Sequence, residues 1–189
     1  QQKEMYLQIW NKKYLVVYSF MQGQQLAKKL HDRRLDTQTI VAIAKELRKI
    51  HDITSNNNEF NLPPTPFKEN NNIKSVLHFD LTKHNIFQLE NGKIGVIDFD
   101  DAKYGESVCD IAILIAHLFF SKKRGVDLKG MEQFIEAYYS QDIERRNREV
   151  AFVKKYALEW IEYTLDGNQF TASIMESFKE KYQLIKRDL

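Results

Sequence analysis

The dipeptide Asn91-Gly92 stands between two alternating apolar runs. This is the strongest short-range signal for a β-hairpin, because both central residues of a type I′ turn need a positive φ. A two-residue loop at this position pairs Asn85 with Asp98 across the hairpin. Directly opposed residues of antiparallel strands hold their Cβ atoms about 4.5–5.5 Å apart on one face. We therefore expect an amide oxygen and a carboxylate side by side, with Asp80 in the segment that enters the hairpin.

These oxygen-bearing side chains suit Mg²⁺, an ion that takes a few protein oxygens together with water and substrate phosphates. The set contains no thiolate, and His78 and His84 are not needed to complete it. Zinc and the other transition metals are therefore weaker candidates for this site.

Composition excludes several other classes of protein. A chain of 189 residues with 43% apolar and 29% charged side chains can build one domain with a hydrophobic core. The net charge of +2 creates no strong field for nucleic acid. The longest apolar run, Ile111–Phe120, is too short to cross a membrane. A single cysteine, Cys109, cannot form an internal disulfide and fits a reducing compartment, so we expect a cytoplasmic protein.

The rest of the pattern predicts a small β portion followed by a mostly helical body. Residues 6–10 and 14–20 read as two strands separated by a turn at 11–13. A helix starts at Asp36 or Thr37, and a polar connector with all three prolines follows at 54–75. Helical spacing then covers most of the chain from Ser107 onward. The apolar positions expected on helix faces are Ile40, Ile43, Ala44, Leu47 and Ile50; Val108, Ile111, Ala112, Ile115 and Phe119; Met131, Phe134, Ile135 and Tyr138; Val153, Tyr156, Ala157, Trp160, Ile161 and Thr164; and Ile174, Phe178 and Tyr182.

The stretch His78-Phe-Asp-Leu-Thr-Lys-His-Asn85, followed by Ile97-Asp-Phe-Asp100, resembles the catalytic loop and metal-binding aspartate of the aminoglycoside phosphotransferase and choline kinase family. The related protein-kinase template has H-x-D-x-x-x-x-N for the base and one metal ligand, then an Asp on a following strand for Mg²⁺. The resemblance runs from about residue 13 to residue 120. Its flanking parts are 14–23, similar to the last strand and hinge of the small lobe; 44–51, similar to a helix that ends in Leu-x-x-Leu-His; and 105–112, similar to a Gly-x-x-x-x-Asp-Ile-Ala segment.

The resemblance implies a role for each matching residue. Asp80 accepts or orients the proton of the attacking hydroxyl, and Asn85 and Asp98 hold Mg²⁺ against the triphosphate of ATP. The expected supporting residues are His78, which braces the loop, and Asp110, which caps a helix or anchors the loop. One of the adjacent acids Asp100 and Asp101 is expected near the metal or substrate, and the alternative for it is a turn-capping role. The backbone of Tyr18, Ser19 and Phe20 is expected to meet the adenine. Two positions depart from the family: Phe79 stands where many relatives have Gly, and Thr82 where many have His.

The implied fold is α+β and protein-kinase-like: a mostly helical C-terminal lobe with a catalytic β-hairpin and a residual hairpin of the N-terminal lobe. Residues 1–22 are expected to be the N-lobe remnant, and 23–189 the C-lobe, with the catalytic loop and metal hairpin at 78–101 and a helical substrate region at 107–189. No Gly-rich phosphate loop and no Val-Ala-x-Lys strand precede the hinge. We therefore expect a truncated kinase that turns over weakly or not at all by itself.

The expected activity is transfer of phosphate from ATP to a hydroxyl of a small molecule: an amino alcohol, an aminoglycoside-like compound, an amino acid or a sugar. Nucleotide and acceptor are the expected partners, with no nucleic acid and no membrane. One candidate substrate site is a helix face that carries three acids and an aromatic ring, which suits a cation, although such a face is also typical of solvated helices. Its residues are Glu159, Glu162, Tyr163 and Asp166.

Two other functions remain open. The first is a catalytically silent binding module derived from a kinase. The second is a metal-dependent phosphohydrolase of the HD type, suggested by His31-Asp32 and His51-Asp52. That scheme needs metal ligands on a bundle of helices, whereas the richest polar cluster here lies on a predicted hairpin.

Overall fold

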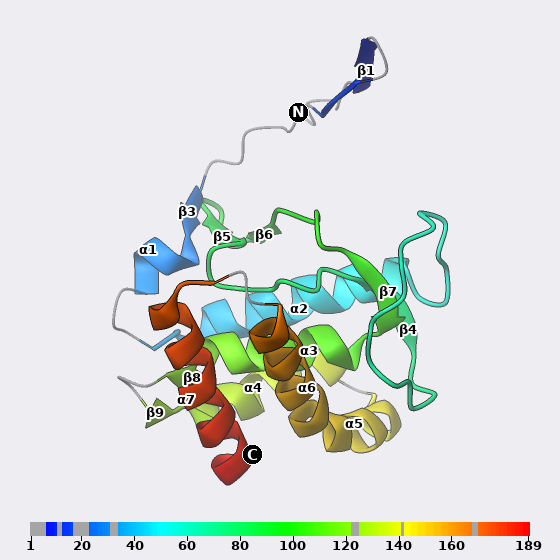
Figure 1. Ribbon diagram of the computed structural model, residues 1–189. Coiled ribbons are helices and arrows are strands. Elements are labelled where there is room, and N and C mark those ends of the chain that lie inside the picture. The colour runs from blue at the N-terminus through cyan, green and yellow to red at the C-terminus, as the bar shows by residue number, and fades with distance from the viewer. Residues whose placement is uncertain are drawn as a thin grey trace.

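The computed structural model describes residues 7–10, 13–16, 23–30, 34–121, 125–140, 142–167 and 170–189. In this part of the chain most of the short strands lie at one end of a larger helical body (Figure 1). All the strand pairs are antiparallel. They are β1 (Leu7–Trp10) with β2 (Lys13–Val16), β3 (Gly23–Gln25) with β5 (Ile86–Leu89), β5 with β6 (Ile94–Val96), β4 (Lys74–Leu77) with β7 (Lys103–Glu106), and β8 (Phe120–Ser121) with β9 (Gly125–Val126).

The first expected hairpin is confirmed as the β1–β2 pair, although residue 6 of its first predicted strand and residues 17–20 of its second lie outside the described residues. The strand β4 begins within the predicted polar connector at 54–75 and leads directly into the candidate catalytic loop. At β3, a Cβ added to Gly23 would lie 2.6 Å from the Gln88 carbonyl oxygen, so this close approach of β3 to β5 requires glycine.

The register predicted for the β5–β6 hairpin is wrong by one residue. Leu89 N–H donates to the Lys93 carbonyl at 2.8 Å, so the loop holds three residues instead of two. Of the Asn-Gly pair only Gly92 has a positive φ, of 76°. The Asn91 side chain instead accepts the Lys93 N–H at 3.0 Å. This side-chain bond and the left-handed glycine fit the common three-residue hairpin loop, which competes with the two-residue turn for the same sequence.

The change of register separates the two residues that were expected to face each other. Ile97 N–H donates to the Asn85 carbonyl at 3.0 Å, so Asn85 lies opposite Ile97 and not opposite Asp98. Asp98 itself has a φ of 68°, so the chain leaves the strand direction there. The Asn85 and Asp98 side chains are therefore positioned by the loops around them and not by cross-strand pairing.

The helices confirm most of the predicted periodicity. Asp36 is the N-cap of α2 (Thr37–Ile53), and its side chain accepts the Thr39 N–H at 2.8 Å. Its expected apolar stripe is buried except for Ile50, which is half-buried, and His51 completes the buried face. The remaining helices are α1 (Leu26–Leu30), α3 (Val108–Leu118), α4 (Leu128–Tyr139), α5 (Ile143–Glu149), the 3₁₀ turn η1 (Val150–Phe152), α6 (Val153–Asp166) and α7 (Ala172–Asp188).

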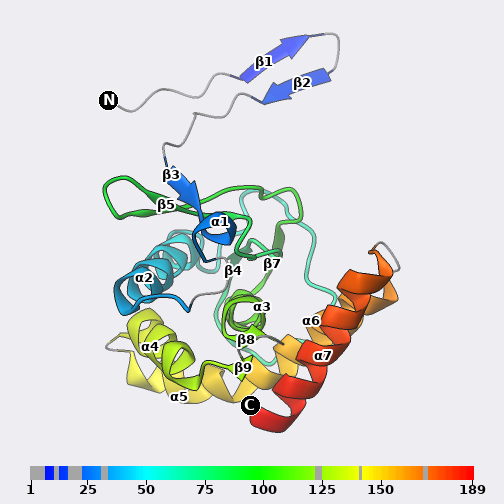
Figure 2. The same cartoon turned by 90° about the vertical axis from the view of Figure 1, so that its left-hand side faces the viewer.

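Helix α3 is the centre of the molecule. It lies between α2 and α4 on one side and α6 and α7 on the other (Figure 2). All its residues are buried except His117, which is half-buried. The sequence predicted one buried face for this helix, but the helix is buried on every side. Among the described helices none is both long and apolar enough to span a membrane.

Because α3 is enclosed on every side, its side chains should dominate the stability of the fold. We expect Ile115→Ala, at a position that is 0% exposed, to lower the free energy of unfolding by about 2–5 kcal/mol. The matched control is Ile53→Ala at the end of α2, where the side chain is 72% exposed and the change should stay within about 0.5 kcal/mol. Urea unfolding followed by circular dichroism compares the two variants. Equal losses would contradict the central role of α3.

Candidate active site

The candidate catalytic loop, residues 78–85, joins β4 to β5. Its backbone turns sharply at Phe79, which has a φ of 65°. This left-handed conformation is uncommon and strained for a bulky residue, whereas glycine adopts it freely. Phe79 is one of the two positions at which the sequence departs from the family that it resembles. The Phe79 ring packs on Phe67 at 5.6 Å and on Tyr163 at 5.9 Å between centroids, so aromatic contacts hold the strained residue.

A buried carboxylate, that of Asp110, holds the same part of the loop. Asp110 lies in the first turn of α3 and is 0% exposed. Its Oδ2 accepts the His78 N–H at 2.7 Å, and its Oδ1 accepts the Phe79 N–H at 2.9 Å. Hydrogen bonds from backbone N–H groups to a carboxylate are stronger than neutral ones, and the helix N-terminus favours the negative charge. Asp110 therefore anchors the loop to α3 through two charge-assisted bonds.

His78 ties the loop to the chain after β6. Its Nδ1 accepts the Asp80 N–H at 3.3 Å, and its Nε2 lies 2.7 Å from the Ile97 carbonyl oxygen. Because a carbonyl can only accept, the Nε2 atom carries the proton. The ring is 1% exposed and lies 4.6 Å from the Phe99 ring. These contacts make His78 a buried support of the loop, without an exposed nitrogen for chemistry.

Asp80 and Asn85 form the centre of the site. The Asn85 Nδ2 donates to the Asp80 backbone oxygen and to its Oδ2, each at 2.9 Å. Within the described residues no donor bonds to the Asn85 Oδ1, which leaves this amide oxygen available as a ligand. Burial raises the pKa of the Asp80 carboxyl, and the charges of Asp101 and Asp98 raise it further, whereas His78 and Asn85 act in the opposite direction.

The chemistry of this donor set fits a hard divalent cation. Burial is the main cause of the raised Asp80 pKa, and the charges of Asp101 and Asp98 raise it further. A bound cation would offset the repulsion by these two acids. The nearby ligands are carboxylate and amide oxygens, which Mg²⁺ prefers. Over the described ranges, no three His, Cys, Asp or Glu side chains lie close enough to hold a metal by themselves. A cation here would therefore need the Asn85 amide, water or substrate oxygens as further ligands.

A cavity of about 860 Å³ opens beside the loop, between the loop, the end of α3, α6 and the start of α7. Asp80 and Asn85 lie in its wall with acids, basic residues and several aromatic rings. The lining residues are Phe79, Asp80, Thr82, His84, Asn85, Asp101, Lys103, His117, Trp160, Tyr163, Thr164, Asp166, Gly167, Phe170, Ile174 and Phe178. A small molecule bound in this cavity would lie next to the Asp80 carboxylate.

Only two of the four residues of the predicted acidic helix face line the cavity. Tyr163 and Asp166 line the cavity, whereas Glu159 and Glu162 are not part of its wall. Glu162 accepts the Tyr182 hydroxyl at 2.7 Å, and Glu159 lies 3.8 Å from the ammonium of Lys155. The structure therefore offers Tyr163 and Asp166, but not the other two, to a substrate in the cavity.

The rest of the cavity wall contains one of the expected acids and two residues expected only in the core. Of the adjacent acids, Asp101 lines the cavity and acts on Asp80, while Asp100 and Asp98 do not line it. Trp160 and Phe178 were expected only as core residues, yet they are buried and also face the cavity. Nothing in their spacing distinguishes them from core positions, because the cavity forms only where the end of α6 and the start of α7 meet the loop.

Two expectations concern residues outside the described ranges. The proposed adenine contacts, Tyr18, Ser19 and Phe20, lie there, as does the His31-Asp32 pair. The second pair of the HD alternative contains His51, which is 1% exposed and contacts the Tyr138 hydroxyl and the Asp110 carboxylate through its two ring nitrogens. His51 thus has no nitrogen left for a metal, and the described residues give no support to an HD phosphohydrolase.

A model of a known family matches residues 70–147, the segment that contains the whole loop and Asp110; its description is "Phosphotransferase enzyme family". The matched segment is similar to this family. The match confirms the resemblance found in the sequence, on which the expectation of a kinase-type phosphotransferase rests. No curated protein sequence gives a significant match.

Solved structures confirm the protein-kinase-like α+β fold. An ethanolamine kinase from Plasmodium vivax has a TM-score of 0.67 at 14% identity, over 96% of this chain and 67% of its own. A choline kinase from Cryptosporidium parvum has a TM-score of 0.57 at 16% identity, over 88% of this chain and 68% of its own. An amicoumacin kinase has a TM-score of 0.58 at 14% identity, over 98% of this chain and 70% of its own. At such identities these likenesses establish the fold alone.

The raised pKa of Asp80 makes a prediction about stability. Since the folded state holds the Asp80 proton more tightly than the unfolded chain, stability falls as pH rises from the ordinary value of 3.8 through the raised pKa. The neutral variant Asp80→Asn should therefore melt at a higher temperature than the wild type at pH 7. The difference should shrink as the pH falls below 3.8. The control is Asp100→Asn, which neutralises an exposed neighbouring acid. An equal rise in melting temperature in this variant would contradict the conclusion that burial of Asp80 destabilises the fold at pH 7.

Proposed function

We propose that this protein transfers a phosphoryl group from ATP, with Mg²⁺, to a hydroxyl of a small molecule. The observation that carries the proposal is the loop centred on Asp80 and Asn85, which opens onto a cavity of about 860 Å³ within the segment that matches the phosphotransferase family. One structural neighbour is described in complex with AMP-PNP and Ca²⁺, which supports a nucleotide and a divalent cation as ligands of this fold.

Asp80 is the group that meets the acceptor hydroxyl. Its carboxylate lies in the cavity wall, and Asn85 holds one of its oxygens by a bond of 2.9 Å. A carboxylate fixed in this way orients the hydroxyl and accepts its proton as the new P–O bond forms. Because burial raises the Asp80 pKa, the carboxylate is a stronger base than an exposed aspartate.

Asn85 and Asp98 would hold the Mg²⁺, with Asp101 and Asp100 close by in the chain. The bound cation would neutralise charge on the phosphate oxygens. Asn85 presents its free Oδ1 because its Nδ2 is committed to Asp80. Asp98 is exposed, and its charge reaches Asp80. Tyr18, Ser19 and Phe20 remain our proposed backbone contacts to the adenine.

The walls of the cavity favour an acceptor with a cationic group. Tyr163, which is 49% exposed, and Trp160 offer aromatic faces, and Asp166 adds a carboxylate. Aromatic rings with a nearby carboxylate bind ammonium groups. An amino alcohol or an aminoglycoside-like compound is therefore the first acceptor to test, followed by amino acids and sugars. A kinase of this kind, with the free and buried thiol of Cys109, fits the reducing cytoplasm.

The metal role of Asp98 can be tested by binding alone. We expect Asp98→Ala to abolish Mg²⁺-dependent binding of ATP, because the cation loses a charged ligand. Isothermal titration of the chain with ATP, with and without Mg²⁺, measures this. The control is Glu90→Gln, which removes one negative charge at the exposed tip of the same hairpin and should leave the affinity unchanged.

The role of Asp80 as a base can be tested in any form of the protein that shows turnover. We expect Asp80→Asn to lower kcat by about 10²–10⁴-fold while Mg²⁺-dependent ATP binding persists. Release of ADP, measured with a panel of amino alcohols, aminoglycosides, hydroxy amino acids and sugars, identifies the acceptor. A variant with wild-type kcat would exclude Asp80 as the base. ATP binding without turnover on any acceptor would favour the silent binding module.

A further inference from the structure

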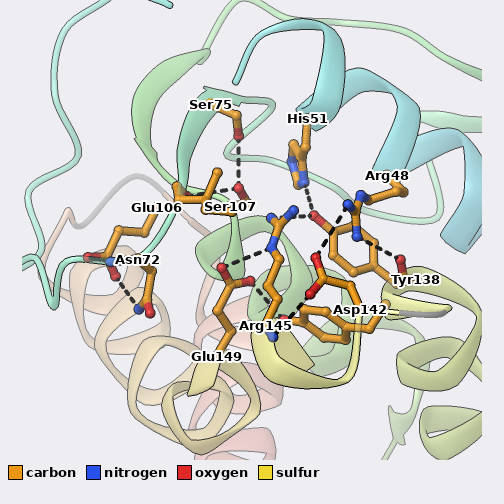
Figure 3. A network of polar contacts seen from close by, with 12 residues as sticks. Arg48, His51, Asn72, Ser75, Glu106, Ser107, Tyr138, Asp142, Arg145 and Glu149 are labelled. Atoms are coloured by element: carbon orange, nitrogen blue, oxygen red, sulfur yellow. Dashed lines mark hydrogen bonds and ion pairs between the residues drawn. The ribbon is translucent and has the colours of Figure 1, made fainter. Parts of the chain in front are cut away.

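Behind the loop, a buried tyrosine contacts the group that supports Asp110. Tyr138, on α4, is 0% exposed, and its hydroxyl lies 2.6 Å from the Nδ1 of His51 at the end of α2 (Figure 3). The Nε2 of the same ring lies 3.3 Å from the Asp110 Oδ2. A chain of polar contacts therefore runs from α4 through α2 to α3, and from Asp110 to the backbone of His78 and Phe79.

The direction of each hydrogen bond in this chain follows from its neighbours. Arg145 can only donate, and its Nη2 points to the Tyr138 oxygen at 3.3 Å, so the tyrosine accepts there and keeps its own proton for His51. Burial raises the pKa of Tyr138, which keeps the hydroxyl protonated. The tyrosine thus donates to Nδ1, and the ring proton of His51 resides on Nε2. From there it donates to the Asp110 carboxylate.

The arginine is itself fixed, so the tyrosine hydroxyl has one favoured orientation. Arg145 is 3% exposed, and its Nε donates to the Glu149 Oε1 at 3.0 Å. Glu149, which is fully buried, also accepts the Tyr139 hydroxyl at 3.0 Å. Figure 3 shows Arg145 between Glu149 and the Tyr138 ring. The buried ion pair of Arg145 and Glu149 therefore presents a donor to the Tyr138 oxygen.

We propose that Tyr138 is a positioning residue for the candidate catalytic loop, acting through His51 and Asp110. A catalytic role of the loop rests on the function proposed above, whereas the coupling of Tyr138 to the loop does not. Without the tyrosine hydroxyl, the Nδ1 atom of the buried His51 ring loses its donor, and the ring is no longer held in one orientation. The bond from Nε2 to Asp110 then weakens. Asp110 is the acceptor of the two backbone bonds that hold Phe79 in its strained conformation, with a φ of 65°, so this loss loosens the loop.

The wild-type chain provides the first test. Nitrogen-15 NMR of the His51 ring should show an unprotonated Nδ1 and a protonated Nε2 at neutral pH. A proton resident on Nδ1 with Nε2 bare would overturn the proposal, and this measurement depends on no variant.

Removal of the hydroxyl is the second test. In Tyr138→Phe we expect the nitrogen-15 signals of the His51 ring to shift, because Nδ1 loses its donor. We also expect the amide hydrogens of His78 and Phe79 to exchange at least about fivefold faster, which corresponds to one weakened hydrogen bond. The control is Tyr156→Phe, which removes the hydroxyl of another buried tyrosine, 1% exposed, that donates to Glu106 instead of to His51. Each rate is compared with the average for amides of α3 in the same variant.

Two outcomes would overturn the proposal: equal exchange at His78 and Phe79 in the two variants, or an unchanged His51 ring in Tyr138→Phe. If Tyr138→Phe does not fold, the tautomer of His51 in the wild-type chain still tests the proposal. Failure of the proposed function appears elsewhere, as a loss of nucleotide binding or turnover, since none of these measurements uses ATP.

Discussion

The buried carboxylate of Asp110 is the interaction on which the rest of the site depends. It joins the start of the central helix to two consecutive amides of the loop, at 2.7 and 2.9 Å. A carboxylate with no exposed surface is stable only where donors surround it, and here two backbone amides and the His51 ring supply them. Because α3 is enclosed by other helices, Asp110 attaches the loop to a rigid part of the core. Asp80, two residues after His78, is therefore placed by the core of the molecule.

Two residues of the site destabilise the fold locally, and the free energy of packing in the core offsets this. Phe79 has an unfavourable backbone conformation, and Asp80 is an acid whose burial and acidic neighbours raise its pKa. Such local costs are typical of sites built for chemistry. The enclosed apolar surface of α3 stabilises the fold enough for this arrangement to persist. A divalent cation and a phosphate would then meet a set of oxygens that is already in place.

Local sequence patterns predicted the helices well, because a helix face depends on spacing along a few turns. The Asp36 cap and the stripe from Ile40 to Leu47 are examples. The hairpin was predicted in place but not in register, since two loop lengths compete for the Asn-Gly signal and differ by only one residue. The acidic face of α6 was predicted as one surface, yet only Tyr163 and Asp166 reach the cavity. The position of α7 decides which residues of α6 face the cavity, and the spacing of α6 does not contain that information.

By itself, the sequence determined the order of the elements, the loop with Asp80 and Asn85 five residues apart, and the likeness to a phosphotransferase family. These depend on short-range spacing, which folding preserves. Only the tertiary structure decided which groups meet across long separations: His78 with Asp110, 32 residues apart, His51 with Asp110, 59 apart, and His51 with Tyr138, 87 apart. A buried polar group must find its partner wherever packing brings one within hydrogen-bond distance. Packing is a property of the whole chain, so no local pattern identifies those partners, and only the resemblance to a family suggested that Asp110 anchors the loop.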